Sequence, residues 1–103
     1  MNANLKWPND VMLSGRKVGG VLTETSKGAV IIGIGVNVST ELSSFPKDLR
    51  KDVTSIKTEL GREVDFSKFL KVLVRELDSL YGVFLSKGAK EIISEWELLS
   101  LEN

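Results

Sequence analysis

The stretch LKWPNDVMLSGRKVGGVLTE, residues 5–24, decides how the first part of the chain folds. Its segments Val-Met-Leu at residues 11–13 and Lys-Val at residues 17–18 flank Ser-Gly-Arg at residues 14–16, which is the pattern of a β-hairpin with a glycine-bearing loop. Residues 5–7 are expected to be extended, because the proline that follows disfavours the helical region for the residue before it. Asn and Asp after that proline favour a turn. We therefore expect short strands joined by tight turns.

The strands continue beyond this stretch. Gly19 and Gly20 precede a strand at residues 21–25, where they predict a bulge or a close approach of another backbone. Ser-Lys-Gly at residues 26–28 predicts the next turn. Residues 29–38, AVIIGIGVNV, are nearly all apolar, so we expect a strand that is covered on both faces.

The second part of the chain has helical signals. A polar, irregular loop at residues 39–53 leads to Thr-Ser at residues 54–55, which opens a short helix that Gly61 closes. Asp65 is placed to cap a long helix, and a last helix covers residues 89–99. The long helix carries apolar residues at helical spacing, which predicts a stripe that faces the core. These residues are Phe66, Phe69, Leu70, Leu73, Leu77, Leu80 and Phe84.

The order of the elements, strands first and helices after them, predicts an α+β fold. The first 40 residues supply an antiparallel or mixed sheet, and the helices pack on one face of it. With 103 residues, the chain is long enough for one domain and too short for two of ordinary size.

Composition excludes several classes of function. Lys plus Arg and Asp plus Glu both number 14, so no net charge attracts nucleic acid or an anionic membrane. The absence of Cys and His excludes thiolate nucleophiles, disulfides, zinc sites and imidazole bases. No apolar run is long enough to span a bilayer, and no signal peptide follows the first residue. We expect a cytoplasmic protein with no nucleic-acid or membrane partner.

Polar residues among the strands are candidates for binding an anion. Lys17 lies two residues before Gly19 and Gly20, and glycines let a ligand approach the backbone while a lysine supplies a point charge for a phosphate or carboxylate. A solvated lysine in a hairpin explains Lys17 equally well. Asn37 ends an apolar strand, so its amide must find partners, and such strand ends are common ligand positions.

Other candidates have plainer explanations. Asp10 and Glu24 could hold Mg²⁺ through oxygen atoms, although their spacing favours two solvated carboxylates. Lys6 is a single lysine in a strand. Trp96 is more typical of a core residue than of a ligand contact.

Four segments together resemble the catalytic domain of the biotin protein ligases. They are KWPND at residues 6–10, GRKVGGVLTE at residues 15–24, GIGVNV at residues 33–38 and Thr-Ser at residues 54–55. Each segment alone would be weak, but their order and spacing are specific, and the resemblance covers nearly the whole chain. It implies an enzyme that forms biotinyl-5′-AMP from biotin and ATP and then transfers biotin to a lysine of a biotin carboxyl carrier protein.

The resemblance also implies roles for individual residues. Lys17 would be the catalytic lysine that meets the biotin carboxylate and the reacting phosphate, with Gly19 and Gly20 beside the substrate. Asp10 would help to place Mg²⁺, and Lys6 would contact a phosphate. The adenylate's nucleotide part would be bound by Asn9, Asn37 and, when a loop closes, Trp96.

Two parts of the family pattern are missing from residues 1–103. The glycine- and arginine-rich biotin-binding loop precedes KWPND in the family, and a small β-barrel follows the last helix. We therefore expect the rear half of a catalytic domain, which is inactive alone. A separate front-half chain could complete it, or it could form a homodimer through residues 29–38 or an exposed sheet face, or it could be a non-catalytic assembly module. A lipoate ligase-like subunit is a further alternative, which the KWPND segment fits less well.

Overall fold

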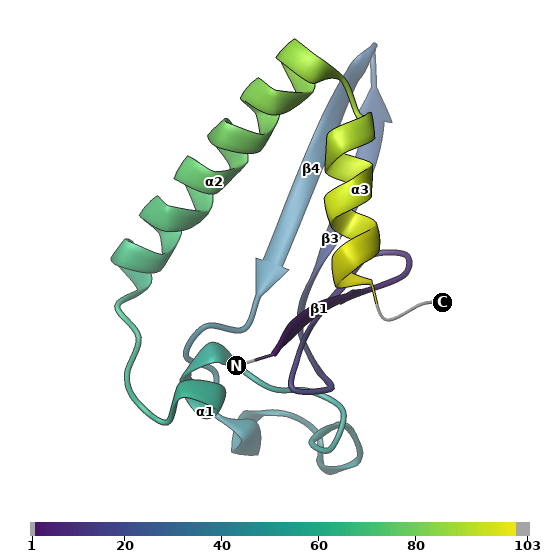
Figure 1. Cartoon of the computed structure of the whole chain (residues 1–103). Helices are drawn as coiled ribbons and strands as arrows, with labels where there is room; N and C mark the ends of the chain where they lie inside the picture. The colour runs from purple at the N-terminus through teal and green to yellow at the C-terminus, as the bar shows by residue number, and fades with distance from the viewer. Residues whose placement is uncertain (1, 101–103) are drawn as a thin grey trace.

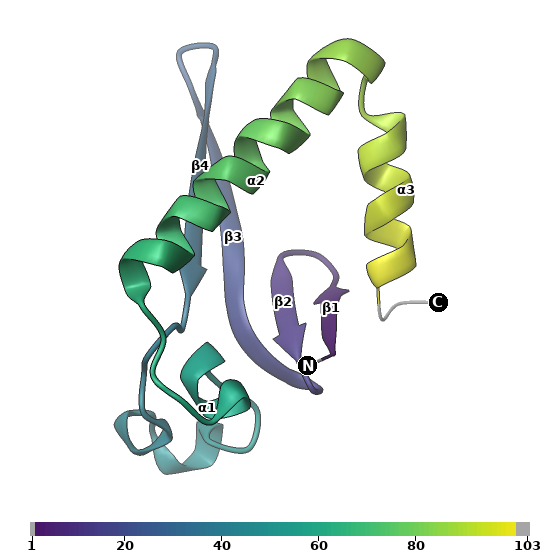
Figure 2. The same ribbon diagram turned by 60° about the vertical axis from the view of Figure 1, so that its left-hand side comes forward.

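The computed structural model of the chain describes residues 2–100 (Figures 1 and 2). Its sheet has four antiparallel strands in the order β1–β2–β3–β4, so that neighbours in sequence are neighbours in the sheet. The strands are β1 (Ala3–Lys6), β2 (Asp10–Leu13), β3 (Arg16–Ser26) and β4 (Ala29–Val36). They are followed by the 3-10 turns η1 (Leu42–Ser44) and η2 (Lys47–Leu49) and by the helices α1 (Ile56–Leu60), α2 (Phe66–Lys87) and α3 (Lys90–Leu99).

The helices α2 and α3 form an open V beside the long β3–β4 hairpin (Figures 1 and 2). Helix α3 packs against α2 and against β1. The side chain of Asn4 on β1 donates a hydrogen bond to the carbonyl of Leu99 at 3.2 Å, which ties the two ends of the fold together. The predicted α+β fold with an antiparallel sheet is confirmed. Within residues 2–100, no helix has both the length and the apolar character needed to cross a membrane.

Both predicted glycine-bearing turns are present. Ser14 and Gly15 join β2 to β3 with φ angles of 50° and 81°, and Lys27 and Gly28 join β3 to β4 with φ angles of 49° and 80°. Two consecutive residues with positive φ form the turn whose twist matches that of the flanking strands. The turns therefore set the register of both hairpins.

The predicted irregularity at the glycine pair is also confirmed. The β2–β3 register shifts between Val11, which faces Gly19, and Met12, which faces Lys17. A bulge of this kind increases the local twist of the strand. A Cβ at Gly19 would lie 2.3 Å from the carbonyl oxygen of Gly35, so only glycine allows β3 and β4 to approach this closely.

Side-chain signals at the helix ends act as predicted. The hydroxyl of Ser55 accepts a hydrogen bond from the N–H of Thr58 and caps α1, which ends at Gly61 with a φ of 69°. Asp65 caps α2 by accepting from the N–H of Lys68 at 3.1 Å. These caps satisfy backbone donors that the first turn of a helix leaves unpaired.

The buried core of the described chain is small. Its apolar members are Met12, Leu13, Val18 and Val38, which gather where β2, β3 and the segment after β4 meet. The expectation that residues 29–38 are covered on both faces is wrong for this chain. Strand β4 ends at Val36 and is an edge of the sheet, and its residues 29–35 are exposed because no layer within residues 2–100 packs on them.

The expectation that the apolar stripe of α2 is core is wrong in the same way. No residue of α2 is buried, and Phe66 is 60% exposed. The stripe has the predicted helical spacing, but α2 contacts mainly α3 and little else within the described residues. The chain thus presents two large apolar surfaces, on β4 and on α2, to its surroundings.

Candidate functional site

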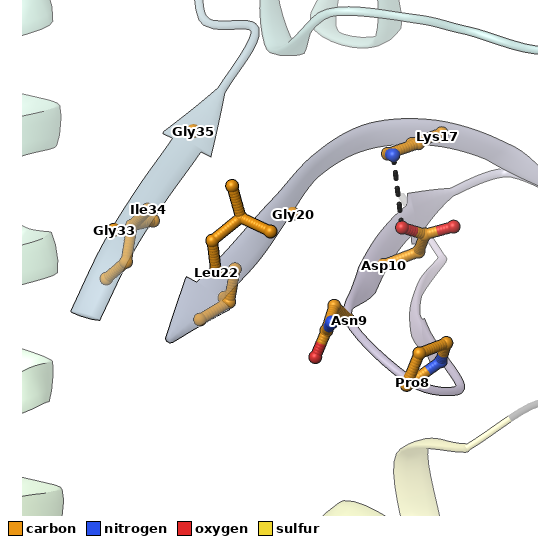
Figure 3. A pocket seen from close by; sticks show the side chains of 10 residues that line it. Pro8, Asn9, Asp10, Lys17, Gly20, Leu22, Gly33, Ile34 and Gly35 are labelled. Carbon is orange, nitrogen blue, oxygen red and sulfur yellow. Dashed lines mark ion pairs between the residues drawn. The ribbon is translucent and has the colours of Figure 1, made fainter. Parts of the chain in front are cut away.

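An open hollow of about 580 Å³ lies between the β1–β2 turn and the strands β3 and β4 (Figure 3). Its walls combine one ion pair, one amide, several apolar side chains and three glycines. The lining residues are Pro8, Asn9, Asp10, Lys17, Gly20, Val21, Leu22, Gly33, Ile34 and Gly35. The hollow therefore brings together residues from three of the four sequence segments noted above.

Lys17 is held firmly by its backbone while its ammonium group stays accessible. Its N–H donates to the carbonyl of Asp52, and its carbonyl accepts from the N–H of Thr54, both at 2.9 Å. Its Nζ lies 3.1 Å from Oδ1 of Asp10, and its side chain is 48% exposed (Figure 3). Asp10 and Lys17 thus form an ion pair, which corrects the interpretation of Asp10 as a simply solvated carboxylate.

Glycines leave the space around this lysine open. A Cβ at Gly20 would lie 3.1 Å from the carbonyl oxygen of Asn9 and 3.7 Å from Cε of Lys17. A Cβ at Gly35 would meet nothing within 4 Å, so the wall on the β4 side is open backbone at Gly35, next to the side chain of Ile34. A lysine beside bare backbone can approach a phosphate or carboxylate closely, because no side chain intervenes.

Asn9 and Trp96 lie at a second, smaller hollow of about 230 Å³ that shares part of this wall. The carbonyl of Asn9 accepts from the N–H of Val21 at 2.9 Å, which fixes the turn against β3. Trp96 on α3 meets Trp7 edge to face, with ring centroids 5.8 Å apart. The hollow combines an aromatic ring with an amide, a combination that suits a planar polar ring.

Comparisons with known proteins show which family this chain resembles in sequence and fold. The family model "Biotin/lipoate A/B protein ligase family" matches residues 1–40. The bifunctional ligase/repressor BirA of Bacillus subtilis is 30% identical, over 98% of this chain and 33% of its own length. The solved biotin protein ligase from Aquifex aeolicus, in complex with biotin and ATP, superposes with a TM-score of 0.87 at 32% identity. This chain is a biotin protein ligase-family domain.

The ligase-family domain spans about a third of the length of the curated relatives it matches. A biotin–[acetyl-CoA-carboxylase] ligase of Mycobacterium tuberculosis, for example, is 37% identical over 73% of this chain and 27% of its own length. The Aquifex structure matches 98% of this chain with 43% of its own. The fold is therefore shared over nearly all of this chain, and more than half of the solved relative has no counterpart in it.

Four of the predicted site residues lie outside the lining of the large hollow in this ligase-family domain: Lys6, Gly19, Asn37 and Trp96, of which Trp96 lines the smaller hollow. The side-chain amide of Asn37 donates to the carbonyl of Thr54 at 3.1 Å, and its backbone carbonyl accepts from the N–H of Ile56. Lys6, at the end of β1, is exposed and pairs in register with Asp10. Gly19 packs against β4 and gives no wall to the hollow.

The charged groups with perturbed titration lie on α1 and around it. Hydrogen bonds that the Lys57 ammonium donates to the carboxylates of Glu41 and Glu63 raise the pKa of Lys57 above its usual value. The Thr54 hydroxyl, which donates to Glu59, holds the pKa of that carboxyl below its usual range. Among residues 2–100, no group of three or more Asp, Glu, His or Cys side chains could enclose a metal ion.

Three residues around Lys17 were assigned no role in the site, although Thr54 belongs to one of the four segments of the resemblance. Asp52 and Thr54 hold Lys17 through backbone atoms, which any residue type possesses. Glu59 lies on α1, five residues beyond Thr54, and its spacing to Lys17 gives no hint of proximity. Only the folded chain places these residues beside the site.

Proposed function

We propose that this chain is the nucleotide-side part of a biotin protein ligase, acting in the cytoplasm. Together with the part of the catalytic domain that precedes KWPND in the family (the front half), it forms biotinyl-5′-AMP from biotin and ATP. It then transfers biotin to a lysine of a biotin carboxyl carrier protein. The observation that carries this proposal is the accessible ammonium of Lys17, a residue whose backbone is fixed at a hollow partly lined by glycines.

The first step needs charge stabilisation more than acid–base catalysis. An oxygen of the biotin carboxylate bonds to the α-phosphorus of ATP, the bond from that phosphorus to the bridging oxygen breaks, and pyrophosphate leaves. The attacking group is already an anion, so the absence of histidine is no obstacle. Lys17 would stabilise the negative charge that grows on the phosphoryl oxygens, as a preorganised cation does.

The second step consumes biotinyl-5′-AMP, which is a mixed anhydride of biotin and AMP. The amine of the acceptor lysine attacks the carbonyl carbon, AMP leaves with the bonding electrons, and the amine loses a proton. Asn9 would contact the nucleotide, and Trp96 lies close enough to the same wall to contact its base. Before substrate binds, the ion pair with Asp10 would neutralise Lys17 and hold its ammonium at the hollow.

The site offers a single protein carboxylate to Mg²⁺. Asp10 is the one carboxylate among the lining residues, and Mg²⁺ commonly takes one or two protein carboxylates together with substrate phosphates and water. Asp10 would be its protein ligand, shared with the ATP phosphates. The ion would neutralise phosphate charge.

The exposed apolar surfaces support a partner that completes the domain. Val30 on β4 is 65% exposed, and Phe66 on α2 is 60% exposed. An edge strand without charge or proline is a ready template for another strand. We propose that the front half pairs with the free edge of β4 and covers the stripe of α2, which accounts for both surfaces at once.

Complementation tests this proposal. The full chain is mixed with a separately expressed front half of the Aquifex aeolicus ligase, and biotin-dependent exchange of pyrophosphate into ATP is measured. We expect exchange from the mixture and none from either part alone. Lys17→Ala should reduce exchange at least about 100-fold, in the range seen when one charge-stabilising donor is removed. Lys90→Ala removes an exposed lysine at the start of α3 and should leave exchange unchanged.

Two results would contradict the proposal. One is a stable complex of the two parts, seen by size-exclusion chromatography, that supports no biotin-dependent exchange. The other is equal exchange by Lys17→Ala and the wild type. A chain that forms only homodimers and excludes the front half would point instead to the assembly module.

A further inference from the structure

Thr54 is fully buried and connects three parts of the fold that surround the site. Its N–H donates to the carbonyl of Lys17 at 2.9 Å, and its carbonyl accepts from the side-chain amide of Asn37 at 3.1 Å. Its hydroxyl donates to Oε2 of Glu59 on α1 at 2.5 Å. Ser55, the other fully buried polar residue in residues 2–100, is accounted for by its role as the cap of α1. The Thr54 hydroxyl has no such role.

The hydroxyl closes a ring that returns to Lys17. Oε2 of Glu59 lies 3.5 Å from Nη2 of Arg16, the residue before Lys17 on β3. The ring therefore runs from Thr54 through Glu59 and Arg16 along the backbone to Lys17, whose carbonyl accepts from Thr54. Because every link is a hydrogen bond, an ion pair or a peptide bond, the ring limits how the backbone of β3 can move where the lysine side chain leaves it.

The carboxylate of Glu59 is the charged group that joins Thr54 to Arg16 in this ring. The side chain of Glu59 is 9% exposed, and an ionised carboxylate in such a place needs donors to offset its lost hydration. The Thr54 hydroxyl is the largest cause of its lowered pKa, and Ser14 and Arg16 lower it further, while burial acts in the opposite direction. At neutral pH, Glu59 is therefore an anion that holds the hydroxyl and the guanidinium together.

We propose that Thr54 is a positioning residue that sets the catalytic Lys17 and the nucleotide-side Asn37 relative to each other. The inference rests on the proposed function, because the positions matter for adenylation. Lys17 lies on β3 and Asn37 follows the end of β4, and the backbone of Thr54 bonds to both. An error of about 1 Å in the position of a catalytic group can cost about 100-fold in rate.

Two substitutions separate the hydroxyl from the rest of the side chain. Thr54→Val keeps the shape and removes the donor, whereas Thr54→Ser keeps the donor and removes a methyl group. In the complemented assembly, we expect Thr54→Val to lower kcat for adenylate formation by at least about tenfold, with the KM for ATP changed by less than about threefold. Thr54→Ser should retain at least about half of the wild-type kcat.

A pH profile distinguishes positioning from mere stability. Thr54→Val removes the strongest cause of the low pKa of Glu59, so the acid limb of kcat should move to higher pH. The groups facing Glu59 include the hydroxyls of Thr54 and Ser14 and the guanidinium of Arg16, and all three lower its pKa. A loss of activity that follows only the unfolded fraction, with an unmoved acid limb, would overturn the proposal.

Nuclear magnetic resonance of the full chain alone makes the result independent of catalysis. Thr54→Val should shift the backbone amide of Lys17 and the side-chain amide of Asn37, and Thr54→Ser should leave both near their wild-type positions. If the wild-type assembly makes no adenylate, the proposed function fails, and these shifts still decide whether Thr54 couples the two residues. Unchanged resonances at both residues would refute the coupling.

Discussion

Substitution of Gly19 by alanine tests the close contact between β3 and β4. The new Cβ would lie 2.3 Å from the carbonyl oxygen of Gly35 and 3.1 Å from Cα of Val36, against about 3.4 Å or more for ordinary contact. Both atoms belong to the backbone of β4, so relief requires a strand shift of about 1 Å that strains the ladder. Overpacking costs about 1–3 kcal/mol, and a backbone clash belongs at the upper end. We expect Gly19→Ala to lose about 3 kcal/mol of unfolding free energy.

Urea unfolding followed by circular dichroism measures this loss. With an m-value of about 1.5 kcal/mol/M, the midpoint should fall by about 2 M. Gly35→Ala is the matched control, because it adds the same methyl group to the facing strand where nothing lies within 4 Å. It should raise the free energy of unfolding, by less than about 1 kcal/mol. Equal midpoints for Gly19→Ala and the wild type would refute the packing argument.

Three further substitutions have expected outcomes. Asp10→Asn breaks the ion pair with Lys17, which is partly exposed. Thermal unfolding should therefore show a loss of unfolding free energy below about 1 kcal/mol. A loss of several kcal/mol would contradict this, because it would mean that the pair contributes strongly to stability. Gly82→Ala, in the middle of α2 with open space around the new Cβ, should raise the urea midpoint by the equivalent of about 1 kcal/mol, and a decrease would show a hidden contact. Glu59 has a lowered pKa in the folded state, so its carboxylate contributes stability above the unfolded value of 4.5 that is lost as pH falls through the folded pKa. Glu59→Gln should therefore shrink the difference in unfolding free energy between neutral and acid pH, and an unchanged difference would contradict this origin of acid sensitivity.

Local signals in the sequence predict the turns and helix ends well. Ser-Gly at residues 14–15 and Lys-Gly at residues 27–28 adopt the positive φ angles that tight hairpins need, and Asp65 caps α2 as its chemistry requires. These features depend on a few neighbouring residues. A single sequence therefore contains the information that determines them.

Burial could not be predicted from the same signals. The apolar run on β4 and the stripe on α2 have the periodicity of buried elements, yet both are largely exposed in this chain. Periodicity indicates which face of an element is apolar, but it does not say whether the covering layer belongs to the same chain. A covering surface outside the chain leaves the periodicity unchanged.

Some residues of the candidate site could be predicted from the sequence, and others could not. Lys17 and Asn9 were predicted as site residues and lie together at the hollow, because both belong to turns and strands that are close in sequence. Asn37 was predicted to need partners, and it has one in the carbonyl of Thr54. The role of Thr54 and Glu59 depends on contacts between β3 and α1 that the sequence does not specify.

Binding of biotinyl-5′-AMP to the complemented assembly, followed by amide chemical shifts of this chain, tests the central claim most directly. Lys17, Gly20 and Gly35 are the positions where bound adenylate would lie against the backbone, so we predict that the largest shifts cluster there. Lys17→Ala should weaken binding while the assembly still forms. Shifts that cluster away from the hollow, with equal affinity for wild type and Lys17→Ala, would contradict the account.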